Sequence, residues 1–261
     1  MRRVDKECGG APACCILYNV SRENILKVEI WSDVVCPWCY IGKRRFESAL
    51  ARFEHRDELE VVWRSFELDP DAPRLREGDY ADRLARKYGT TREQAVQMHE
   101  RITATAAQEG LTFRFDQARA GNTFDAHRLL HLAARLGVQD QAKERLMRAY
   151  FSEGEPIGDP ETLVRLVAEA GVPADEARSV LNGDAYAADV RADEREAAEL
   201  GISGVPFFVL DRRYGVSGAQ PAELLLQALE QAWREAHPVR QLTPVGAAAG
   251  EAVCTDDTCA I

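Results

Sequence analysis

Two cysteines separated by two residues give the strongest chemical signal in this sequence. The tetrapeptide Cys36-Pro37-Trp38-Cys39 follows an apolar run rich in β-branched residues, namely Val28, Ile30, Val34 and Val35. Such a run predicts a buried strand. After the tetrapeptide, apolar residues recur at steps of three and four, which predicts a helix with one buried face: Phe46, Ala49, Leu50 and Phe53. The Cys-x-x-Cys motif therefore opens a helix.

This position suits thiol chemistry. The first turn of a helix has unpaired N–H groups and the positive end of the helix dipole, and both stabilise a thiolate. We therefore expect Cys36 to be acidic and nucleophilic. Pro37 fits the first helical position because it lacks the N–H that would be unpaired there. Cys39, one turn further along, can close a short disulfide with Cys36 or resolve a mixed disulfide.

Other interpretations of the pair stay open. Cys-x-x-Cys is also the spacing of half a zinc site, although zinc pairs usually occupy tight hairpin turns and a partner pair would have to come from the far C-terminus. A structural disulfide or two unreactive core thiols are further alternatives. The predicted helix after the motif favours a reactive dithiol.

A second feature lies at residues 201–218, which predict a β-hairpin with strands at 207–210 and 214–217 and a polar turn at 211–213. Val205-Pro206 leads into its first strand. A proline cannot donate to the ladder, so it belongs at the first residue or the edge of a strand, and in a tight turn it can be cis. A plain trans proline that starts the strand is equally open on the residues alone.

Together these features resemble the thioredoxin superfamily, and within it the DsbA-type oxidoreductases of the FrnE kind. Three separated motifs carry the resemblance over residues 26–237: Cys-Pro-Trp-Cys-Tyr-Ile-Gly at 36–42, Asn-Thr-x-x-Ala-His-Arg at 122–128, and Val205-Pro206. The resemblance implies an α/β fold, thioredoxin-like with an inserted all-helical domain. It also implies a cis Pro206 that faces the cysteines and a Val205 backbone that pairs with the substrate chain.

The resemblance further places Asn122 and Thr123 near the mouth of the site, but they can equally serve only to cap a helix. With Pro37, Trp38, Val205 and Pro206 they are the candidate substrate-binding residues. His127 and His131 lie four apart on one predicted helix face, a spacing that a metal pair could use. No carboxylate or cysteine accompanies them at ligand spacing, so we assign no metal site, and a packed or surface helix explains them more simply.

The rest of the chain supplies the elements of such a fold. Leu59, Val61 and Trp63 alternate with less apolar neighbours and predict a second strand, and a loop follows to about residue 79. Cap signals then predict a run of helices: at 80–88, after Thr90 and Thr91 with Glu93 and Gln94 placed for a capping box, from Thr123, from Gln139, from Pro160 after an Asp159 cap, from Ala174, and at 185–200, with a last helix at 221–236. We expect a thioredoxin-like domain at 25–70 and 191–237 and a helical insertion at 71–190.

Composition excludes some classes of partner. The 261 residues carry a net charge of −10, from 33 basic and 43 acidic side chains, which argues against nucleic acid and anionic membrane surfaces. No apolar stretch approaches the length of a membrane-spanning helix. Residues 1–24 lack the apolar core of a secretory signal, so we expect a cytoplasmic location. Cys8, Cys14 and Cys15 fall in this extension, which we expect to be disordered.

A second cysteine pair ends the chain. Residues 238–250 predict a flexible linker, and residues 238–261 a tail that carries Cys254 and Cys259. A flexible tether could bring this pair to the first one as an electron relay, and Asp256 and Asp257 should raise its thiol pKa values. Zinc binding by the two pairs, or no role, are the alternatives.

The predicted function is a thiol–disulfide oxidoreductase or isomerase that uses Cys36 and Cys39, needs no cofactor, and acts on protein or small-molecule thiols and disulfides, glutathione among them. Thiolate stabilisation at the helix end would favour the reduced enzyme and hence oxidising power. A glutathione-dependent transferase or isomerase of the kappa or 2-hydroxychromene-2-carboxylate isomerase type is one alternative, although those enzymes typically have serine at the reactive position. A zinc-binding module is another.

Overall fold

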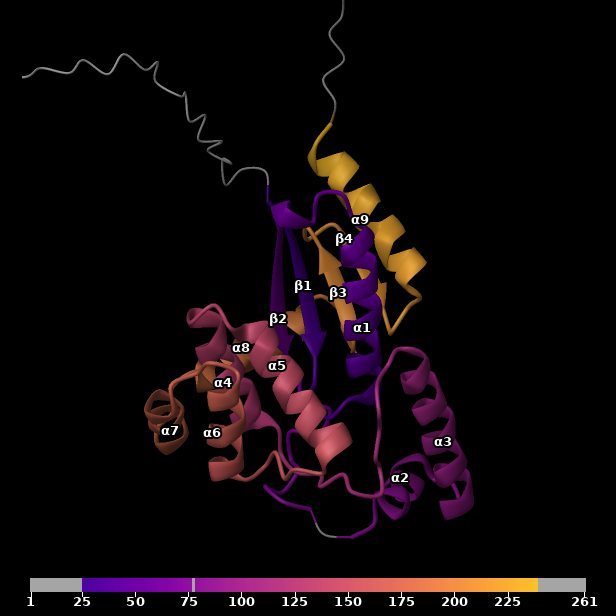
Figure 1. The fold of residues 1–261 in the computed structure, drawn as a ribbon, viewed down its shortest axis with the longest axis vertical. Coiled ribbons are helices and arrows are strands. Elements are labelled where there is room, and N and C mark those ends of the chain that lie inside the picture. The colour runs from indigo at the N-terminus through magenta and orange to yellow at the C-terminus, as the bar shows by residue number, and fades with distance from the viewer. Residues whose placement is uncertain (1–24, 77, 239–261) are drawn as a thin grey trace, which may run out of the picture.

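The computed structural model describes residues 25–76 and 78–238 and is built around a four-stranded sheet in the order β2-β1-β3-β4 (Figure 1). β1 runs parallel to β2 and antiparallel to β3, and β3 runs antiparallel to β4. The strands are β1 Leu26–Ser32, β2 Leu59–Ser65, β3 Phe207–Leu210 and β4 Tyr214–Ser217. This mixed sheet, with a helical insertion between β2 and β3, is the thioredoxin-like α/β fold that the sequence predicts.

Two helices cover one face of the sheet. α1 (Pro37–Arg52) and α9 (Ala222–Ala236) pack side by side against it. Because neighbouring side chains in a strand point to opposite faces, Ile30 and Phe208 join this core, whereas Trp31 and Val209 point the other way. The apolar period of three and four in α1 therefore identifies the face that is buried here.

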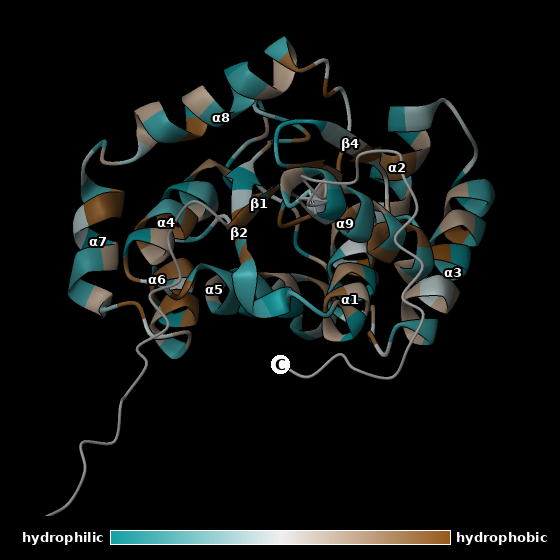
Figure 2. Ribbon diagram, turned by 90° about the horizontal axis from the view of Figure 1, so that it is seen from above, coloured by the Kyte–Doolittle hydropathy of each residue, from teal (hydrophilic) through white to brown (hydrophobic). Residues whose placement is uncertain are grey.

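α8 (Ala187–Glu199) covers the opposite face, as Figure 2 shows from above. A buried carboxylate anchors this side. Glu29 of β1 forms ion pairs with Arg64 of β2 and Arg212 of the hairpin turn, and α8 contributes Asp193 and Glu196 to the same network. The network explains how β1 tolerates a charged residue that is 1% exposed.

The insertion contains the helices that the cap signals predict. They are α2 Tyr80–Tyr88, α3 Arg92–Gln108, α4 Phe124–Arg135, α5 Gln139–Arg148, α6 Pro160–Glu169 and α7 Ala174–Asn182. Thr91 and Gln94 form the expected capping box, and the Asp159 side chain accepts a hydrogen bond from the N–H of Thr162 at 2.8 Å. A π-helical turn at Ala149–Glu153 and a 3₁₀ turn at Arg56–Glu58 are features that the sequence did not signal.

The end of β1 and the position of α8 bear on two expectations. Val34 and Val35 were expected in the first strand, but β1 ends at Ser32 and they form the turn before α1. They are apolar because they pack on the helical core, not because they are strand residues. The predicted domain border between residues 190 and 191 falls inside α8, which contacts both β2 and α4.

Several predictions lie outside the described residues: those for Cys8, Cys14 and Cys15 in residues 1–24, and for Cys254 and Cys259 in the tail. Within the part of the chain that the structure describes, none of the helices is long and apolar enough to cross a membrane.

The loop between β2 and α2 is held by two glycines from the insertion. A Cβ atom added at Gly121 or Gly158 would overlap the backbone carbonyl oxygen of Arg74. The N–H of Asn122 and that of Arg76 add hydrogen bonds to Pro73 and Ala120 across the same contact, at 3.0 and 2.9 Å. Glycine is required here because backbone meets backbone.

Gly158→Ala should therefore destabilise the protein. The methyl group would overlap a carbonyl that cannot rotate away, and overpacking of this kind costs about 1–3 kcal/mol. Urea denaturation measures the free energy of unfolding. Gly183→Ala is the matched control, because the nearest atom to its added Cβ is Ser179 O at 3.6 Å. Equal stability of the two variants would contradict this account of the loop.

Candidate active site

The two motif cysteines lie where α1 begins. Cys36 is the N-cap residue with an extended backbone (φ −86°, ψ 114°), and Pro37 occupies the first helical position, as predicted. The carbonyl of Cys36 accepts hydrogen bonds from the N–H groups of Cys39 and Tyr40 at 3.1 and 3.3 Å. Both cysteines are free thiols, with Cys36 4% exposed and Cys39 fully buried. An incoming sulfur can therefore reach Cys36 and not Cys39.

The turn before β3 closes over this helix end. The Val205–Pro206 peptide bond is cis, as the resemblance implies. The Cys36 thiol donates to the carbonyl oxygen of Val205, with 3.6 Å between sulfur and oxygen. This contact joins residues 169 positions apart and stabilises the protonated form of the thiol.

The expectation that Cys36 is acidic is wrong for this reduced, closed site. The contact with the Cys39 sulfur, together with burial, raises the pKa of Cys36 well above its usual range, and the Asp33 carboxylate adds to the rise. The N–H of Cys39 acts in the direction that the helix end predicted, but it does not offset these effects. Burial and neighbouring groups outweigh the helix dipole because a thiolate that loses water needs more than one N–H donor.

Buried charges lie under the cysteine pair. Asp33, three residues before Cys36, accepts a hydrogen bond from the N–H of Leu68 at 2.8 Å and one from His127 Nε2 at 3.3 Å. Burial by itself would raise the pKa of Asp33, but His127, the Leu68 N–H and Lys143 hold it below its ordinary value. Burial lowers the pKa of His127 against the opposing effect of Asp33. At neutral pH a carboxylate therefore faces a neutral imidazole.

Lys143 of α5 balances that carboxylate. Its ammonium group donates to the carbonyl of Ser32 at 3.1 Å and is fully buried. Burial lowers the pKa of Lys143 to about 8, while Cys39, Asp33 and Cys36 act to raise it. A lysine with this pKa, electrostatically coupled to both thiols, can exchange a proton near neutral pH.

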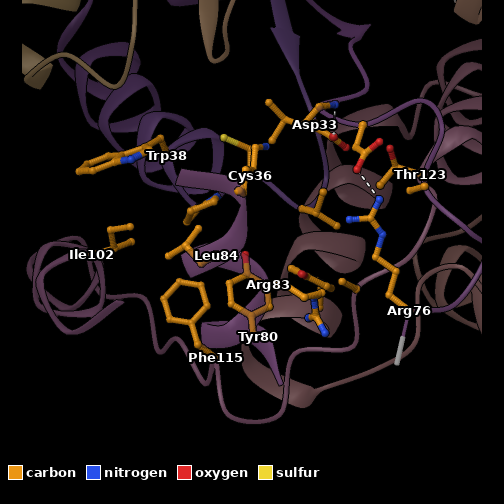
Figure 3. A pocket seen from close by; sticks show the side chains of 18 of the residues that line it. Asp33, Cys36, Trp38, Arg76, Tyr80, Arg83, Leu84, Ile102, Phe115 and Thr123 are labelled. Atoms are coloured by element: carbon orange, nitrogen blue, oxygen red, sulfur yellow. Dashed lines mark hydrogen bonds and ion pairs between the residues drawn. The ribbon is translucent and has the colours of Figure 1, made fainter. Parts of the chain in front are cut away.

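A cavity of about 370 Å³ opens beside Cys36 (Figure 3). Its walls come from the active-site turn, the β2–α2 loop, helices α2 and α3, and the segments around residues 115, 120–123, 150 and 204–205. In Figure 3 the Tyr80 hydroxyl points toward Cys36, and Trp38 lies to one side of Cys36. The Trp38 side chain is 41% exposed, so it forms an apolar rim beside the thiol.

The structure separates the remaining candidates. Thr123 is buried in the cavity wall. The Asn122 side chain instead donates to the carbonyl of Pro70 at 3.0 Å and accepts from the N–H of Phe124 at 2.9 Å, so it joins the β2–α2 loop to the start of α4. Substrate contacts at Pro37, Trp38, Val205, Pro206, Asn122 and Thr123 remain predictions.

His127 and His131 contact different carboxylates. His127 lies against Asp33, whereas His131 Nε2 lies 3.2 Å from Asp193 Oδ2 and 3.1 Å from Ser65 Oγ. Among the described residues, no group of three or more histidine, cysteine, aspartate or glutamate side chains could hold a metal ion.

Sequence reasoning missed Asp33, Lys143 and Tyr80. A polar residue at the end of an apolar strand run was a usable signal for Asp33. Nothing in the sequence around Lys143 distinguishes it from a surface lysine.

The comparisons with known proteins agree with this geometry. A model of the DSBA-like thioredoxin domain matches residues 27–230. A probable DsbA oxidoreductase from Streptomyces coelicolor is 51% identical, with a TM-score of 0.77 over 90% of this chain and 99% of its own. YwbO of Bacillus subtilis (strain 168) is 28% identical over 187 residues, 70% of this chain and 86% of YwbO. The cytosolic disulfide reductase DsbM of Pseudomonas aeruginosa, solved with GSH, shares the fold at 20% identity, with a TM-score of 0.54 over 80% of this chain and 96% of its own.

The charges near Cys36 should move its titration in opposite directions. Asp33→Asn removes a carboxylate that raises the pKa of Cys36, so that pKa should fall, whereas Lys143→Met removes a cation and the pKa should rise. The pH dependence of iodoacetamide alkylation, followed by mass spectrometry on the peptide that contains Cys36, measures this pKa. A Cys39→Ser background leaves only one motif thiol to report.

In every one of these variants the alkylation rate should increase with pH above neutrality, because the thiolate is the reactive form. Shifts of the same sign in the two charge variants would refute the assignment of Asp33 and Lys143.

Proposed function

We propose, since this chain belongs to the DSBA-like thioredoxin family, that it is a thiol–disulfide oxidoreductase. In the mechanism that we propose, Cys36 exchanges with the substrate and Cys39 resolves the mixed disulfide. The observation that carries the proposal is the asymmetry of the pair. Cys36 borders the cavity and is slightly exposed, whereas Cys39 is fully buried one helical turn behind it. Because Cys39 is out of reach of substrate, it can act only in the second step of the exchange, as the thiol that attacks the mixed disulfide.

The exchange balances as two steps. The Cys36 thiolate attacks a substrate disulfide, a mixed disulfide forms, and the first substrate sulfur leaves and takes a proton. Cys39 then loses a proton and attacks Cys36, which releases the second substrate thiol and leaves a Cys36–Cys39 disulfide. Two electrons move from enzyme to substrate. The proton that Cys39 loses leaves with the second substrate thiol, and the Lys143 ammonium group, which is electrostatically coupled to Cys39, would stabilise the thiolate form of Cys39.

Substrate binding itself activates Cys36 in this proposal. At rest the thiol donates to the Val205 carbonyl. The family resemblance assigns the backbone of this residue to pairing with the substrate chain. A substrate N–H that takes over the carbonyl would deprive the protonated thiol of its acceptor and so favour the thiolate.

The direction we propose is reduction, with isomerisation where the mixed disulfide rearranges. A raised Cys36 pKa withdraws the thiolate stabilisation that makes a dithiol a strong oxidant, so the reduced enzyme becomes the better electron donor. This reverses the oxidising direction expected from the helix end alone. Glutathione, present in the structure of DsbM, is a candidate thiol partner and a convenient probe.

Reduction of insulin disulfides with dithiothreitol tests the roles of the two cysteines. Cys36→Ser should abolish turnover because no sulfur reaches substrate. Cys39→Ser should accumulate mixed disulfides that mass spectrometry detects. Cys14→Ser, which also removes one thiol, is the control and should keep wild-type activity. Turnover in the Cys36→Ser chain would rule the proposal out.

A cooperating role for Cys254 and Cys259, which lie outside the described residues, is part of the same proposal. A chain ending before Cys254 should reduce one equivalent of disulfide as fast as the full chain, because Cys36 and Cys39 are intact. Its steady-state rate with dithiothreitol should be lower if the tail carries electrons to the buried pair. Equal rates of the truncated and full chains in both assays would contradict an electron relay through the tail.

A further inference from the structure

Two polar groups beside Cys36 lack partners in the described part of the chain. Arg83 Nη2 and His99 Nε2 are both buried, and neither has a hydrogen-bond acceptor or donor opposite it. Leaving such a group unsatisfied costs about 1–3 kcal/mol, so each is an unusual feature that invites an explanation. Both residues line the cavity that opens at Cys36.

The helix pair α2 and α3 holds these groups in place. The Arg83 guanidinium lies over the Tyr80 ring, 5.2 Å from its centroid, and its other amino group donates to the carbonyl of Gly78. His99 stacks on Phe115 with ring centroids 4.6 Å apart and lies 4.9 Å from the Tyr80 ring. Aromatic contacts therefore fix both side chains while Arg83 Nη2 and His99 Nε2 stay without a partner among the described residues.

Charge around the cavity is uneven. Arg76 is neutralised by Asp69, and Asp33 is balanced beneath the cysteines by Lys143 and His127. Neither Arg83 nor the exposed Lys87 forms an ion pair with an acidic side chain within residues 25–76 and 78–238, and both line the cavity. Asp79 at the N-cap of α2 acts electrostatically on both Arg83 and His99, but its carboxylate accepts hydrogen bonds from the N–H groups of Ala81 and Asp82 and lies 3.6 Å from Arg92. Among the described residues, the α2 side of the cavity therefore carries positive charge that no direct ion pair neutralises.

The remaining wall is apolar and the space is small. Figure 3 shows Leu84 and Phe115 next to the Tyr80 ring and Ile102 further toward Trp38. A cavity of about 370 Å³ lies within the range of small-molecule sites, whereas a folded protein surface would have to insert a loop to reach a thiol that is 4% exposed.

We propose that this cavity binds a low-molecular-weight disulfide or thiol that carries a carboxylate, with the carboxylate paired to Arg83 and His99 and the sulfur placed at Cys36. The inference rests on the proposed exchange chemistry and names its substrate class. Arg83 supplies a charge-assisted hydrogen bond, His99 a second polar contact, and the aromatic wall covers the carbon skeleton.

The chemistry is the two-step exchange described above. Reduced Cys36 takes one sulfur of the acidic disulfide and releases the other as a thiol. Attack by Cys39 releases the second, so one enzyme dithiol converts one disulfide into two thiols without a further reductant in a single turnover.

Single-turnover kinetics with matched disulfides test the assignment. The probes are 3,3′-dithiodipropionate, which is anionic, bis(2-hydroxyethyl) disulfide, which is neutral, and cystamine, which is cationic. The wild-type chain should react with the anionic disulfide about tenfold or more faster than with the neutral one, and slowest with cystamine, since a charge-assisted hydrogen bond contributes at least this factor.

Arg83→Met should lower the rate with the anionic probe far more than the rate with the neutral probe, and His99→Leu should reduce the preference in part. Arg83→Lys keeps the charge and should restore some of it. Arg86→Met is the matched control, because this exposed arginine of the same helix does not line the cavity and should retain the full preference.

Failure of the carboxylate site can be distinguished from failure of the proposed function. No preference in the wild type, or equal loss of both rates in Arg83→Met, overturns the carboxylate site and leaves the oxidoreductase intact. No reaction with any of the three disulfides by a chain that still reduces insulin also overturns the carboxylate site alone. Only the loss of both reactions in the wild type overturns the proposed function itself.

Discussion

The contact between the first turns of α1 and the turn before β3 is the constraint on which the site depends. It brings Cys36 against Val205, and it is possible because Gly42 has no side chain: a Cβ atom there would lie 2.9 Å from Pro206 Cγ. The segment between β4 and α9 is fixed to the same helix by Arg45, whose guanidinium donates to the carbonyl of Ala219 at 2.6 Å. A helix interior normally disfavours glycine. Here close approach of the two segments outweighs that preference.

The second constraint is electrostatic, and the opposing effects differ in size. A helix N-terminus offers a thiolate one or two N–H groups and part of a unit charge. Burial removes most of the water that would otherwise stabilise the same charge, and the Cys39 sulfur and Asp33 both disfavour it. Reactivity at Cys36 therefore depends on what the substrate brings and on the buried Lys143, rather than on the helix end alone. We therefore expect the Cys36 thiol to be unreactive until substrate binds.

Local signals in the sequence predicted the elements well, because each depends on residues close together in the chain. Capping residues such as Thr91 and Asp159 and the hairpin after Pro206 needed no tertiary information. The groups that set the chemistry of the site were harder to predict. Asp33 meets His127 across 94 positions, and Lys143 reaches Ser32 across 111. A buried lysine and a surface lysine look alike in a sequence, and only the packing of α5 under the cysteines distinguishes them.

Different elements of the fold determine the reactivity of the thiols and the specificity for substrate. The sheet, α1 and the Val205–Pro206 turn place the sulfurs, and all of them, apart from Leu26 at the start of β1, lie within the range that matches the DSBA-like thioredoxin domain. Half of the residues that line the cavity come instead from the β2–α2 loop and the pair α2 and α3, which lie between β2 and β3. These helices pack mainly on each other and touch α1 at few points. Changes at Arg83 or His99 can therefore alter which disulfide enters without disturbing the thiols, whereas changes at Gly42 or Asp33 must affect every substrate.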